Sequence, residues 1–529
     1  MTRIDERVST HVYKVKRISK EEMKSIAGVC VYDQPPFCNA ACPLKLDVKA
    51  MLKAAAENDF KKAFKIYESI APFPLILSAG CGAPCEEKCR LCELGDGIAI
   101  GDIERAVALS GGAGEKRSIF RVRKKKKAAV FGSGLFALLL AGELEKKGYP
   151  VTAICGEADE EEYLRVAAGF LREDDFYTEL KRLRGKDIAF EFNAEMTREL
   201  FEEKRGGFDV LCASEKAALD IFPGAVRDEG IMLMESEGLL TGGGETVLEA
   251  ALGARKAALT ADRLAQGIDP RSARGEEGPV TSRLYTNPDL ARGLIRIKGC
   301  ESGYTREQAA EEAGRCMQCH CDECLRGCAY LRRFNKHPGL LSREIYNNTQ
   351  IIMGDHPLNR AMNACALCGQ CTVTCPHGFD MAHVCRTARE NMVDTDKMPL
   401  AAHEFALLDM LFSNGEAYLC RKQPGHSHCR YVFFPGCQAA AIAPEAVIAA
   451  YEDLCTRLKG GVALMLGCCG AIAHWAGRGE MYGEVRDKIA AELAALEDPV
   501  IIAGCPSCMK LLSEQDMAET VGIWTVLRD

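Results

Sequence analysis

Residues 365–376 read CALCGQCTVTCP, and this short stretch decides the fold of the region around it. Its cysteines follow the spacing C-x2-C-x2-C-x3-C-P, which is the run that wraps a [4Fe–4S] cube. Three thiolates would bind one cube, and the fourth, Cys375, would reach a second one. A zinc knuckle, the alternative, needs only two cysteine pairs and no closing Cys-Pro. The motif therefore predicts a two-cluster domain and requires a partner motif.

The partner motif lies upstream, at residues 316–328, and it is irregular. It reads CMQCHCDECLRGC, so it offers five thiols where four are needed, and no proline follows it. We expect Cys316, Cys319 and Cys324 to bind one cube and Cys321 to bind none. Cys328 would instead reach the cube that is held by the trio of the downstream motif. With the helical pattern of residues 340–362, the region resembles the helical two-cluster ferredoxin module in the C component of heterodisulfide reductase. The predicted ligands are Cys316, Cys319, Cys324, Cys328, Cys365, Cys368, Cys371 and Cys375.

The composition around these motifs is that of an ordinary, large globular protein. A chain of 529 residues exceeds what one core usually serves, so we expect about three or four domains. A net charge of -8 gives no general attraction to nucleic acid or anionic membranes. The N-terminus is too charged for a signal peptide, and no apolar run of ~18 residues predicts a membrane span. We therefore expect a cytoplasmic protein.

The 28 cysteines depart from this ordinary picture. In a reducing cytoplasm, clustered cysteines indicate metal ligands or redox chemistry rather than disulfides. They gather at residues 30–92, 316–375 and 420–508, whereas residues 93–299 contain only Cys155 and Cys212. Metal sites are thus expected to flank a cysteine-poor domain.

The first cysteine group has two parts, CVYDQPPFCNAACP at residues 30–43 and CGAPCEEKCRLC at residues 81–92. Residues 45–70 between them show apolar side chains at helical spacing. The pattern resembles the N-terminal two-cluster domain of the glutamate synthase small subunit and of dihydropyrimidine dehydrogenase. That family's first motif is C-x2-C-x4-C-x3-C-P, and this chain matches it except at Asp33.

This resemblance implies two cubes in the N-terminal domain. Asp33 or the extra Cys92 would complete the first cube, and an oxygen ligand would alter its potential. Loss of that cluster is the alternative. The resemblance assigns Cys30, Cys38 and Cys89 to the first cube, and Cys42, Cys81, Cys85 and Glu104 to the second.

A Rossmann-like opening follows at residues 128–137, which read AAVFGSGLFA. A strand, a G-x-G-x-x-A turn and a helix place backbone N–H groups where a pyrophosphate could bind. The segment resembles the flavin half of the glutamate synthase small subunit. This resemblance implies FAD bound at Gly132, Gly134 and Ala137, with Glu157 as the acidic residue after the second strand.

Four departures from that family at cofactor-contacting positions argue against FAD. Cys155 replaces the acidic residue that holds the ribose, and no Gly-Gly pair follows it. Ser214 and Glu215 replace a Thr-Gly pair, and Leu239 replaces an aspartate, where a larger side chain hinders close backbone approach. No second G-x-G-x-x-G for NADPH occurs in the domain. We expect a scaffold without direct NAD(P)H oxidation; FAD retention is the alternative, because the first glycine turn survives.

The third cysteine group has the spacing C-x30-C-C-G-x34-C-x2-C. Residues 460–467 and 498–505 read as buried parallel strands, so each cysteine set would follow a strand and the sets would converge at one sheet edge. The arrangement resembles the CCG module in the B component of heterodisulfide reductase. Its five cysteines are Cys437, Cys468, Cys469, Cys505 and Cys508.

The resemblance implies that these cysteines hold a noncubane [4Fe–4S] assembly, with Cys468 and Cys469 as the candidate catalytic pair. An ordinary cube with one bystander thiol and a zinc site are the alternatives. Family members often carry two CCG repeats and this chain has one, so a site with two opposed clusters would need another protein chain. Cys420 and Cys429, with two nearby histidines, form either a small zinc site or a plain loop.

The predicted architecture is multidomain α and α/β. It comprises a helical domain with two [4Fe–4S] clusters at 1–115, a Rossmann-like domain of degenerate FAD type at 122–275, a helical ferredoxin domain with two more clusters at 290–410, and an α/β CCG domain at 411–529. No Walker loop, HExxH or Ser-His-Asp motif accompanies them.

Two functions follow from these motifs. The first is an iron–sulfur subunit of a cytoplasmic, anaerobic oxidoreductase complex. Its four cubane clusters and one CCG cluster would relay electrons between a partner flavoprotein or ferredoxin and a terminal acceptor. The second is a catalytic subunit that reduces a disulfide or another small substrate at the CCG cluster. The missing nicotinamide domain and the single CCG repeat favour the first, and both predict a hetero-oligomer that binds no nucleic acid.

Overall fold

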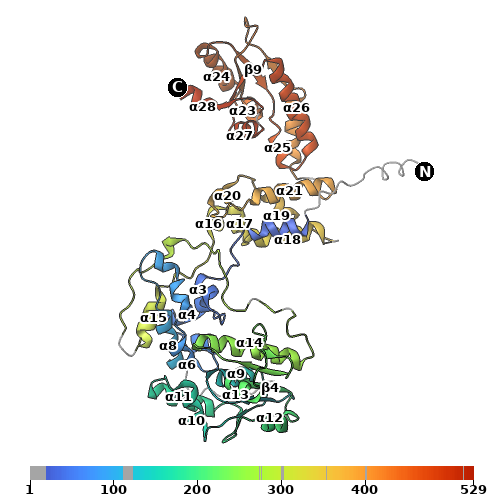
Figure 1. Ribbon diagram of the computed structural model, residues 1–529. Coiled ribbons are helices and arrows are strands. Elements are labelled where there is room, and N and C mark those ends of the chain that lie inside the picture. Colours follow the sequence, from blue (N-terminus) through green and yellow to red (C-terminus); the bar gives the residue numbers. More distant parts are fainter. Residues whose placement is uncertain are drawn as a thin grey trace, which may run out of the picture. The chain divides into compact units, whose positions relative to one another are not determined.

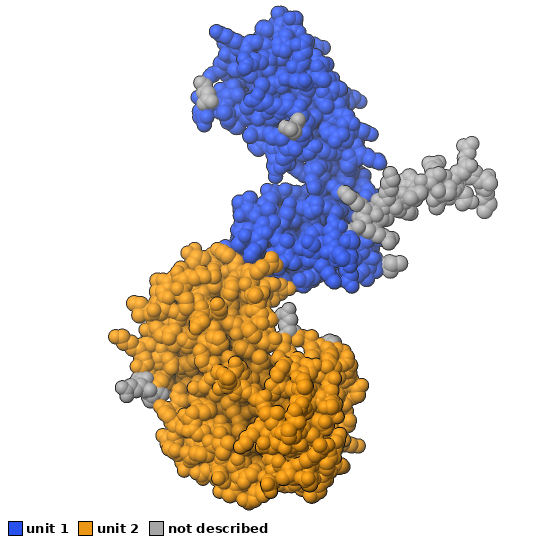
Figure 2. All heavy atoms as spheres, viewed as in Figure 1, with its two compact units in different colours: residues 1–32, 322–529 blue, residues 33–321 orange. Residues whose placement is uncertain are grey.

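The computed structural model describes residues 19–110, 123–272, 274–275, 277–299, 303–352, 354–399, 402–515 and 517–528. The chain divides into two compact units, which Figure 2 colours separately. Unit 1 combines residues 1–32 with residues 322–529, and unit 2 is residues 33–321. Residues 1–18 and 111–115 of the predicted first domain, and Cys300, lie outside the described residues. The predicted multidomain α and α/β fold is confirmed.

The first part of unit 2 is a set of short helices (Figure 1). Asp47 and Asp59 cap two of them, because their carboxylates accept hydrogen bonds from the free N–H groups of Ala50 and Lys62. The helices are α3 (Phe37–Ala41), α4 (Val48–Ala56), α5 (Phe60–Glu68), α6 (Pro74–Gly80), α7 (Pro84–Glu87), the 3₁₀ turn η1 (Arg90–Glu93) and α8 (Ile100–Ser110).

A later helix, α15 (Arg306–Gly314), belongs to the same helical body. It begins with a capping box formed by Thr305 and Gln308, and it packs against α4 and α8. The chain therefore returns to its N-terminal helices after the intervening α/β domain. The predicted boundary at residue 290 placed these residues with the ferredoxin domain, whereas they fall in unit 2.

The α/β domain of unit 2 is built on a six-stranded sheet with the order β3-β2-β1-β4-β6-β5. Only β5 runs antiparallel, at one edge. The strands are β1 (Ala128–Phe131), β2 (Val151–Ile154), β3 (Ile188–Glu191), β4 (Val210–Ser214), β5 (Leu233–Met234) and β6 (Leu239–Gly242). The helices are α9 (Leu135–Lys146), α10 (Glu160–Ala168), α11 (Glu173–Arg184), α12 (Arg198–Arg205), α13 (Glu215–Ile221) and α14 (Val247–Ala265).

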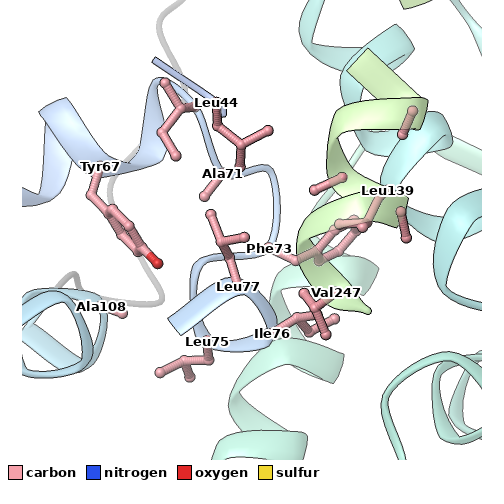
Figure 3. Close-up of a cluster of buried hydrophobic side chains, with 14 of the residues drawn as sticks. Leu44, Tyr67, Ala71, Phe73, Leu75, Ile76, Leu77, Ala108, Leu139 and Val247 are labelled. Carbon is pink, nitrogen blue, oxygen red and sulfur yellow. The ribbon is translucent and has the colours of Figure 1, made fainter. Parts of the chain in front are cut away.

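One hydrophobic core joins the helical body to this α/β domain. Figure 3 shows Phe73 and Leu77 of the helical body facing Leu139 of α9 and Val247 of α14. Gly142 makes this contact possible, because a Cβ there would stand 2.9 Å from the Phe73 ring. The two parts of unit 2 are therefore one packed body, in which the Rossmann-like domain supports the N-terminal helices.

Unit 1 contains a second helical domain. Helix α2 packs on α18, and the core includes the side chains of Cys324, Leu341, Cys371 and Cys385. The helices are α2 (Lys20–Gly28), α16 (Glu323–Gly327), α17 (Ala329–Phe334), α18 (Pro338–Gln350), α19 (Asn359–Ala364), α20 (Gln370–Thr374), α21 (Met381–Asp394) and α22 (Glu404–Asn414).

The C-terminal part of unit 1 is an α/β domain whose five strands have the order β11-β10-β8-β9-β7. The predicted buried strands are present as β9 and β10, and both run parallel to β8 between them. The strands are β7 (Leu419–Arg421), β8 (Tyr431–Phe434), β9 (Val462–Leu466), β10 (Val500–Ala503) and β11 (Thr520–Gly522). The helices are α23 (Cys437–Ile442), α24 (Pro444–Arg457), α25 (Ala471–Trp475), α26 (Gly479–Ala495), α27 (Pro506–Glu514) and α28 (Ile523–Arg528).

Among the described residues, no helix is both long enough and apolar enough to cross a membrane.

Candidate metal centres

Three cysteines and one glutamate meet inside the helical body of unit 2. Cys42 ends α3, Cys81 follows α6, Cys85 lies in α7, and Glu104 projects from α8 with only 3% of its surface exposed. Burial and the nearby Glu104 raise the pKa of Cys81 to about 12. Burial and Glu86 raise the pKa of Glu104 to about 8. Free of metal, this group is a set of desolvated acids, and a bound cation would favour their charged forms.

The surroundings of this group fit an iron–sulfur cluster. Tyr67 is fully buried beside it, and its hydroxyl points away from α5 in Figure 3. Burial raises the pKa of Glu104, and a hydrogen bond from the Tyr67 side chain works against that rise. Tyr67 therefore favours the charged carboxylate, which is the form that binds iron, and three thiolates with one carboxylate are a donor set that suits a [4Fe–4S] cluster.

A second cavity of unit 2 is lined by four further cysteines. Two of them, Cys38 and Cys89, come from the N-terminal motifs, and two, Cys316 and Cys319, come from the motif beyond the Rossmann-like domain. Sequence reasoning did not pair these two sets, because over 200 residues separate Cys89 from Cys316 in the chain.

The other residues predicted for the first N-terminal cube are not among those that line this cavity. Cys30 belongs to unit 1, where it lies against Gly339 of α18, and Asp33 begins unit 2. Cys92 is exposed, and its thiol donates to the carbonyl oxygen of Glu86 at 3.4 Å. The assignment of these three residues to one cube therefore stays a prediction.

The ferredoxin-type domain brings two cysteine motifs together in unit 1. Helices α16 and α20 lie side by side, and each one ends directly before a cysteine, Cys328 or Cys375. Cys328 lines a cavity of about 910 Å³ together with Cys365, Cys368 and Cys371. This placement is the one that the predicted cross-over requires, in which Cys328 joins the trio of the other motif.

Two residues of α21 near this cavity were missed by sequence reasoning. A hydrogen bond from the buried thiol of Cys385 lowers the pKa of Cys365 to about 7. Arg389, although only 2% exposed, donates to the carbonyl oxygens of Met362 (3.0 Å), Cys365 and Trp475 (2.7 Å). The available signal was an arginine at a position where the helical repeat of α21 places apolar residues.

The five cysteines of the CCG motif converge at the carboxyl edge of the C-terminal sheet. Cys437 follows β8, Cys468 and Cys469 follow β9, and Cys505 and Cys508 follow β10. The side chains of Cys437, Cys468, Cys469 and Cys508 are neighbours in that order, since the pKa of each of the first three thiols is affected by the next one. The fifth cysteine, Cys505, lies beside Gly436, where an added Cβ would be 3.0 Å from the Cys505 Cβ.

Two backbone features position the adjacent cysteines. The side chain of Asn414 accepts from the Cys468 N–H at 2.8 Å and donates to the Cys468 carbonyl oxygen at 3.1 Å. Gly470 has a φ of +82° and starts α25, so the chain turns sharply after the cysteine pair. The turn lets the two side chains point in different directions, which suits a cluster that binds both thiols.

The predicted alternative zinc site has a different environment. Cys429 is fully buried and Cys420 is half-buried near Glu492, while His428 pairs with Glu497 at 2.8 Å. Among the described residues, no three His, Cys, Asp or Glu side chains gather closely enough to hold a single metal ion.

The residues expected to hold FAD give mixed evidence for a dinucleotide site. Gly134 has a φ of +100° and open space beside it, and Glu157 has a buried oxygen without a hydrogen-bond partner in the described structure. In contrast, Ser214 packs directly against Gly132, and the Glu215 carboxylate packs against Gly243 at the same sheet edge. A carboxylate there opposes the negative charge of a pyrophosphate.

Three family models of cysteine-containing domains match parts of the chain. Residues 7–112 match the family model of dihydropyrimidine dehydrogenase domain II with its 4Fe-4S cluster. Residues 315–380 match that of the 4Fe-4S dicluster domain, and residues 431–513 that of the cysteine-rich CCG domain. The predicted iron–sulfur and CCG domains are confirmed.

Relatives of known activity are similar to parts of the chain. The NADPH-Fe(3+) oxidoreductase beta subunit of Geobacter sulfurreducens is 28% identical over 230 residues, covering 41% of this chain and 33% of that protein. The NADP(+)-dependent formate dehydrogenase beta subunit of Moorella thermoacetica is 28% identical over 159 residues, covering 25% and 21%. The glutamate synthase [NADPH] small chain of Azospirillum brasilense is 29% identical over 146 residues, covering 26% and 29%. The predicted resemblance to that family is confirmed, although the chain spans a third or less of each relative.

Proposed function

We propose that this chain is an iron–sulfur electron-transfer subunit of an oxidoreductase complex. It relays electrons through several [4Fe–4S] centres between a partner flavoprotein or ferredoxin and a terminal acceptor. The observation that carries the proposal is the gathering of cysteines into four separate, partly buried groups, two in each unit. Cluster potentials depend on ligands, burial and nearby hydrogen bonds, so such a set can be graded for transfer. The relatives named above are oxidoreductase subunits, which also supports a hetero-oligomer.

Three of these groups supply a ligand set of their own. In unit 2, one centre uses the carboxylate of Glu104 with three thiolates. In unit 1, Cys328 completes the trio of the CALCGQC motif, and the CCG cysteines hold a separate centre. The proposed ligands of these three centres are Cys42, Cys81, Cys85 and Glu104; Cys328, Cys365, Cys368 and Cys371; and Cys437, Cys468, Cys469, Cys505 and Cys508.

The relay has a direct test on the anaerobically purified chain. We expect about twenty irons per chain, four for each of five centres: the four groups above and the second centre of the ferredoxin-type domain, whose remaining cysteines include Cys324 and Cys375. Reduced methyl viologen should reduce these centres, and the reduced chain should pass electrons to added ferredoxin or ferricyanide. It should not turn over disulfides such as cystine or glutathione disulfide. Iron analysis, EPR and stopped-flow absorbance provide the readouts, and a chain that holds the clusters but transfers no electrons would refute the relay.

A catalytic role at the CCG site is the second candidate, and one cavity favours it. Unit 1 contains a cavity of about 490 Å³ next to α25 and α27, with His474, Arg386 and Lys510 on its wall. Arg386 and Lys510 share the wall with Asp380 and Glu514, so the mixed charge of the lining suits a small polar substrate. Multiple turnovers of a disulfide by the isolated, reduced chain would establish this role in place of a relay that needs partners.

The Rossmann-like domain serves as a scaffold without flavin in this proposal. Glu215 lies at the sheet edge where a pyrophosphate would bind, and Arg227 pairs with it at 3.1 Å. We therefore expect less than a tenth of a flavin per chain after acid extraction, measured by fluorescence of the supernatant. As the control, the Glu215→Gly variant is extracted in the same way and should also release no flavin. Flavin released by this variant alone would show that the rest of the site is intact and that Glu215 is what blocks it. Stoichiometric FAD from the unaltered chain would overturn the scaffold assignment.

A further inference from the structure

The segment that leads to Cys316 is anchored in the N-terminal helical body. Glu312 of α15 is fully buried, and its carboxylate accepts from the N–H groups of Ala99 (3.0 Å) and Ile297 (2.9 Å). Arg315 pairs with Glu312 at 2.5 Å and donates to the carbonyl oxygen of Asp96 at 2.5 Å. A buried, fully paired ion pair of this kind fixes position, since breaking it would leave an uncompensated charge.

The loop after α15 is held at both of its cysteines. The Lys49 ammonium donates to the carbonyl oxygen of Cys319 at 3.0 Å. The Gln318 amide donates to the carbonyl oxygen of Lys49 at 3.3 Å and to the Cys316 sulfur at 3.4 Å. Met317, between them, is buried in the core of unit 2. The two thiols are therefore presented to the N-terminal helices by a loop that these contacts fix in place.

These contacts bring the loop's two thiols to the cavity that Cys38 and Cys89 line from the other side. Phe37 and Leu91 contribute apolar wall, and Lys88 and Arg90 contribute positive charge. The four cysteines thus come from two separate segments and line one small, largely enclosed cavity.

The backbone of the loop matches that of a recognised cluster motif in the same chain. In Cys316–Cys319 the third residue, Gln318, has a φ of +51°, and in Cys365–Cys368 the third residue, Leu367, has a φ of +53°. Such left-handed conformations are unusual for residues other than glycine. The two C-x2-C turns therefore share a rare backbone conformation at the same position, and the second turn belongs to the C-x2-C-x2-C-x3-C-P run.

We infer that Cys38, Cys89, Cys316 and Cys319 together bind one [4Fe–4S] cluster. This inference rests on the proposed function only in taking iron–sulfur clusters as the bound groups. It assigns to the N-terminal body a centre with two ligands from the segment before the Rossmann-like domain in the sequence and two from the segment after it. Cys316 and Cys319 take the ligand positions that family spacing gives to Cys30 and Asp33. They are then not ligands of the ferredoxin-type domain.

Single substitutions with matched controls test this assignment. Cys38→Ala and Cys316→Ala should each remove about four irons and the same EPR signal, and the double variant should lose no more than either single one. Cys30→Ala and Cys92→Ala should keep that signal. If Cys38→Ala and Cys316→Ala remove different signals, and the double variant loses about eight irons, the assignment is wrong. Zinc in place of iron at this site would also overturn it.

A measurement on the unaltered holoprotein covers the case in which these variants do not fold. Clusters are removed stepwise with ferricyanide and EDTA, and newly exposed thiols are alkylated and identified by mass spectrometry. Cys316 and Cys319 should become reactive in step with Cys38 and Cys89. Exposure in step with Cys324 and Cys328 would place them in the ferredoxin-type domain instead. Failure of the relay assay with this pattern intact would refute the proposed function alone.

Discussion

Replacing Cys469 with alanine is expected to abolish the CCG centre and leave the other clusters in place. The iron content should fall from about twenty to about sixteen per chain, and one EPR signal should disappear. The physical reason is the central position of Cys469, whose thiol lies between those of Cys468 and Cys508. Without the middle thiol, the remaining ligands cannot surround the same irons.

The same substitution at each of the five CCG cysteines distinguishes the two kinds of centre. A noncubane assembly that uses every thiol should be lost in all five variants. An ordinary cube with a bystander should survive one of them, and survival in the Cys468→Ala or Cys469→Ala variant would show that the pair does not act as a unit.

The matched control for this series is Cys455→Ala. Cys455 lies on α24 of the same domain, partly buried and outside the converging group. The Cys455→Ala variant should retain about twenty irons and every EPR signal. Loss of iron in the control as well would show that the domain tolerates no cysteine change, and the series would then contradict the assignment of specific ligands.

Replacing Arg389 with methionine should produce the largest effect of any change outside the cysteines. The substitution leaves three carbonyl oxygens without their donor, and each buried unpaired group costs about 1–3 kcal/mol. Two of these carbonyls belong to Met362 and Cys365, and the third belongs to Trp475 of the CCG domain. We expect a loss of about 3–5 kcal/mol, measured as a lower midpoint of denaturant unfolding of unit 1.

The same variant should also lower the reduction potential of the centre that includes Cys365. A buried cation stabilises the more negative, reduced cluster, by on the order of 2 kcal/mol at an effective dielectric constant near 20. Since 1.4 kcal/mol corresponds to about 59 mV for one electron, the expected shift is ~80 mV to more negative values. Redox titration followed by EPR measures it.

Arg386→Met is the control for Arg389. Arg386 lies on the same helix but is about one-third exposed, and its contacts are His474 at 3.0 Å and Glu390 at 3.9 Å. Its removal should change the potential by less than a quarter of the Arg389 effect. Equal shifts in both variants would show that general helix charge, rather than the buried guanidinium, sets the potential.

Local patterns predicted most of the fold. The strands β9 and β10 could be recognised as short apolar runs, and the convergence of the CCG cysteines followed from parallel strands that end at one edge. The expected cross-over of Cys328 stays a prediction from spacing, and the structure places Cys328 in the same cavity as Cys365, Cys368 and Cys371. Each of these inferences depends on contacts between elements that are close together in the sequence. Such elements have few possible arrangements, so their contacts can be predicted from local patterns.

Contacts between distant segments were harder to predict. The position of the Cys316–Cys319 loop depends on Glu312, Arg315 and Lys49, whose partners lie some 200 or more residues away. Family spacing assigned Cys30 to the first N-terminal cube, an assignment that stays a prediction, and within unit 1 this residue packs on Gly339. A spacing pattern records which residues are present and not where an irregular segment will pack.

The return of α15 to α4 and α8 has a consequence for synthesis of the chain. The Rossmann-like domain is an insertion between two parts of one helical body, so residues 48–110 emerge from the ribosome long before residues 306–319. At ordinary elongation rates the delay is roughly 10–40 s. The first helices must wait with one face uncovered while the sheet folds, and the helical body closes last. Metal insertion at the Cys38 cavity would then follow the folding of the inserted domain.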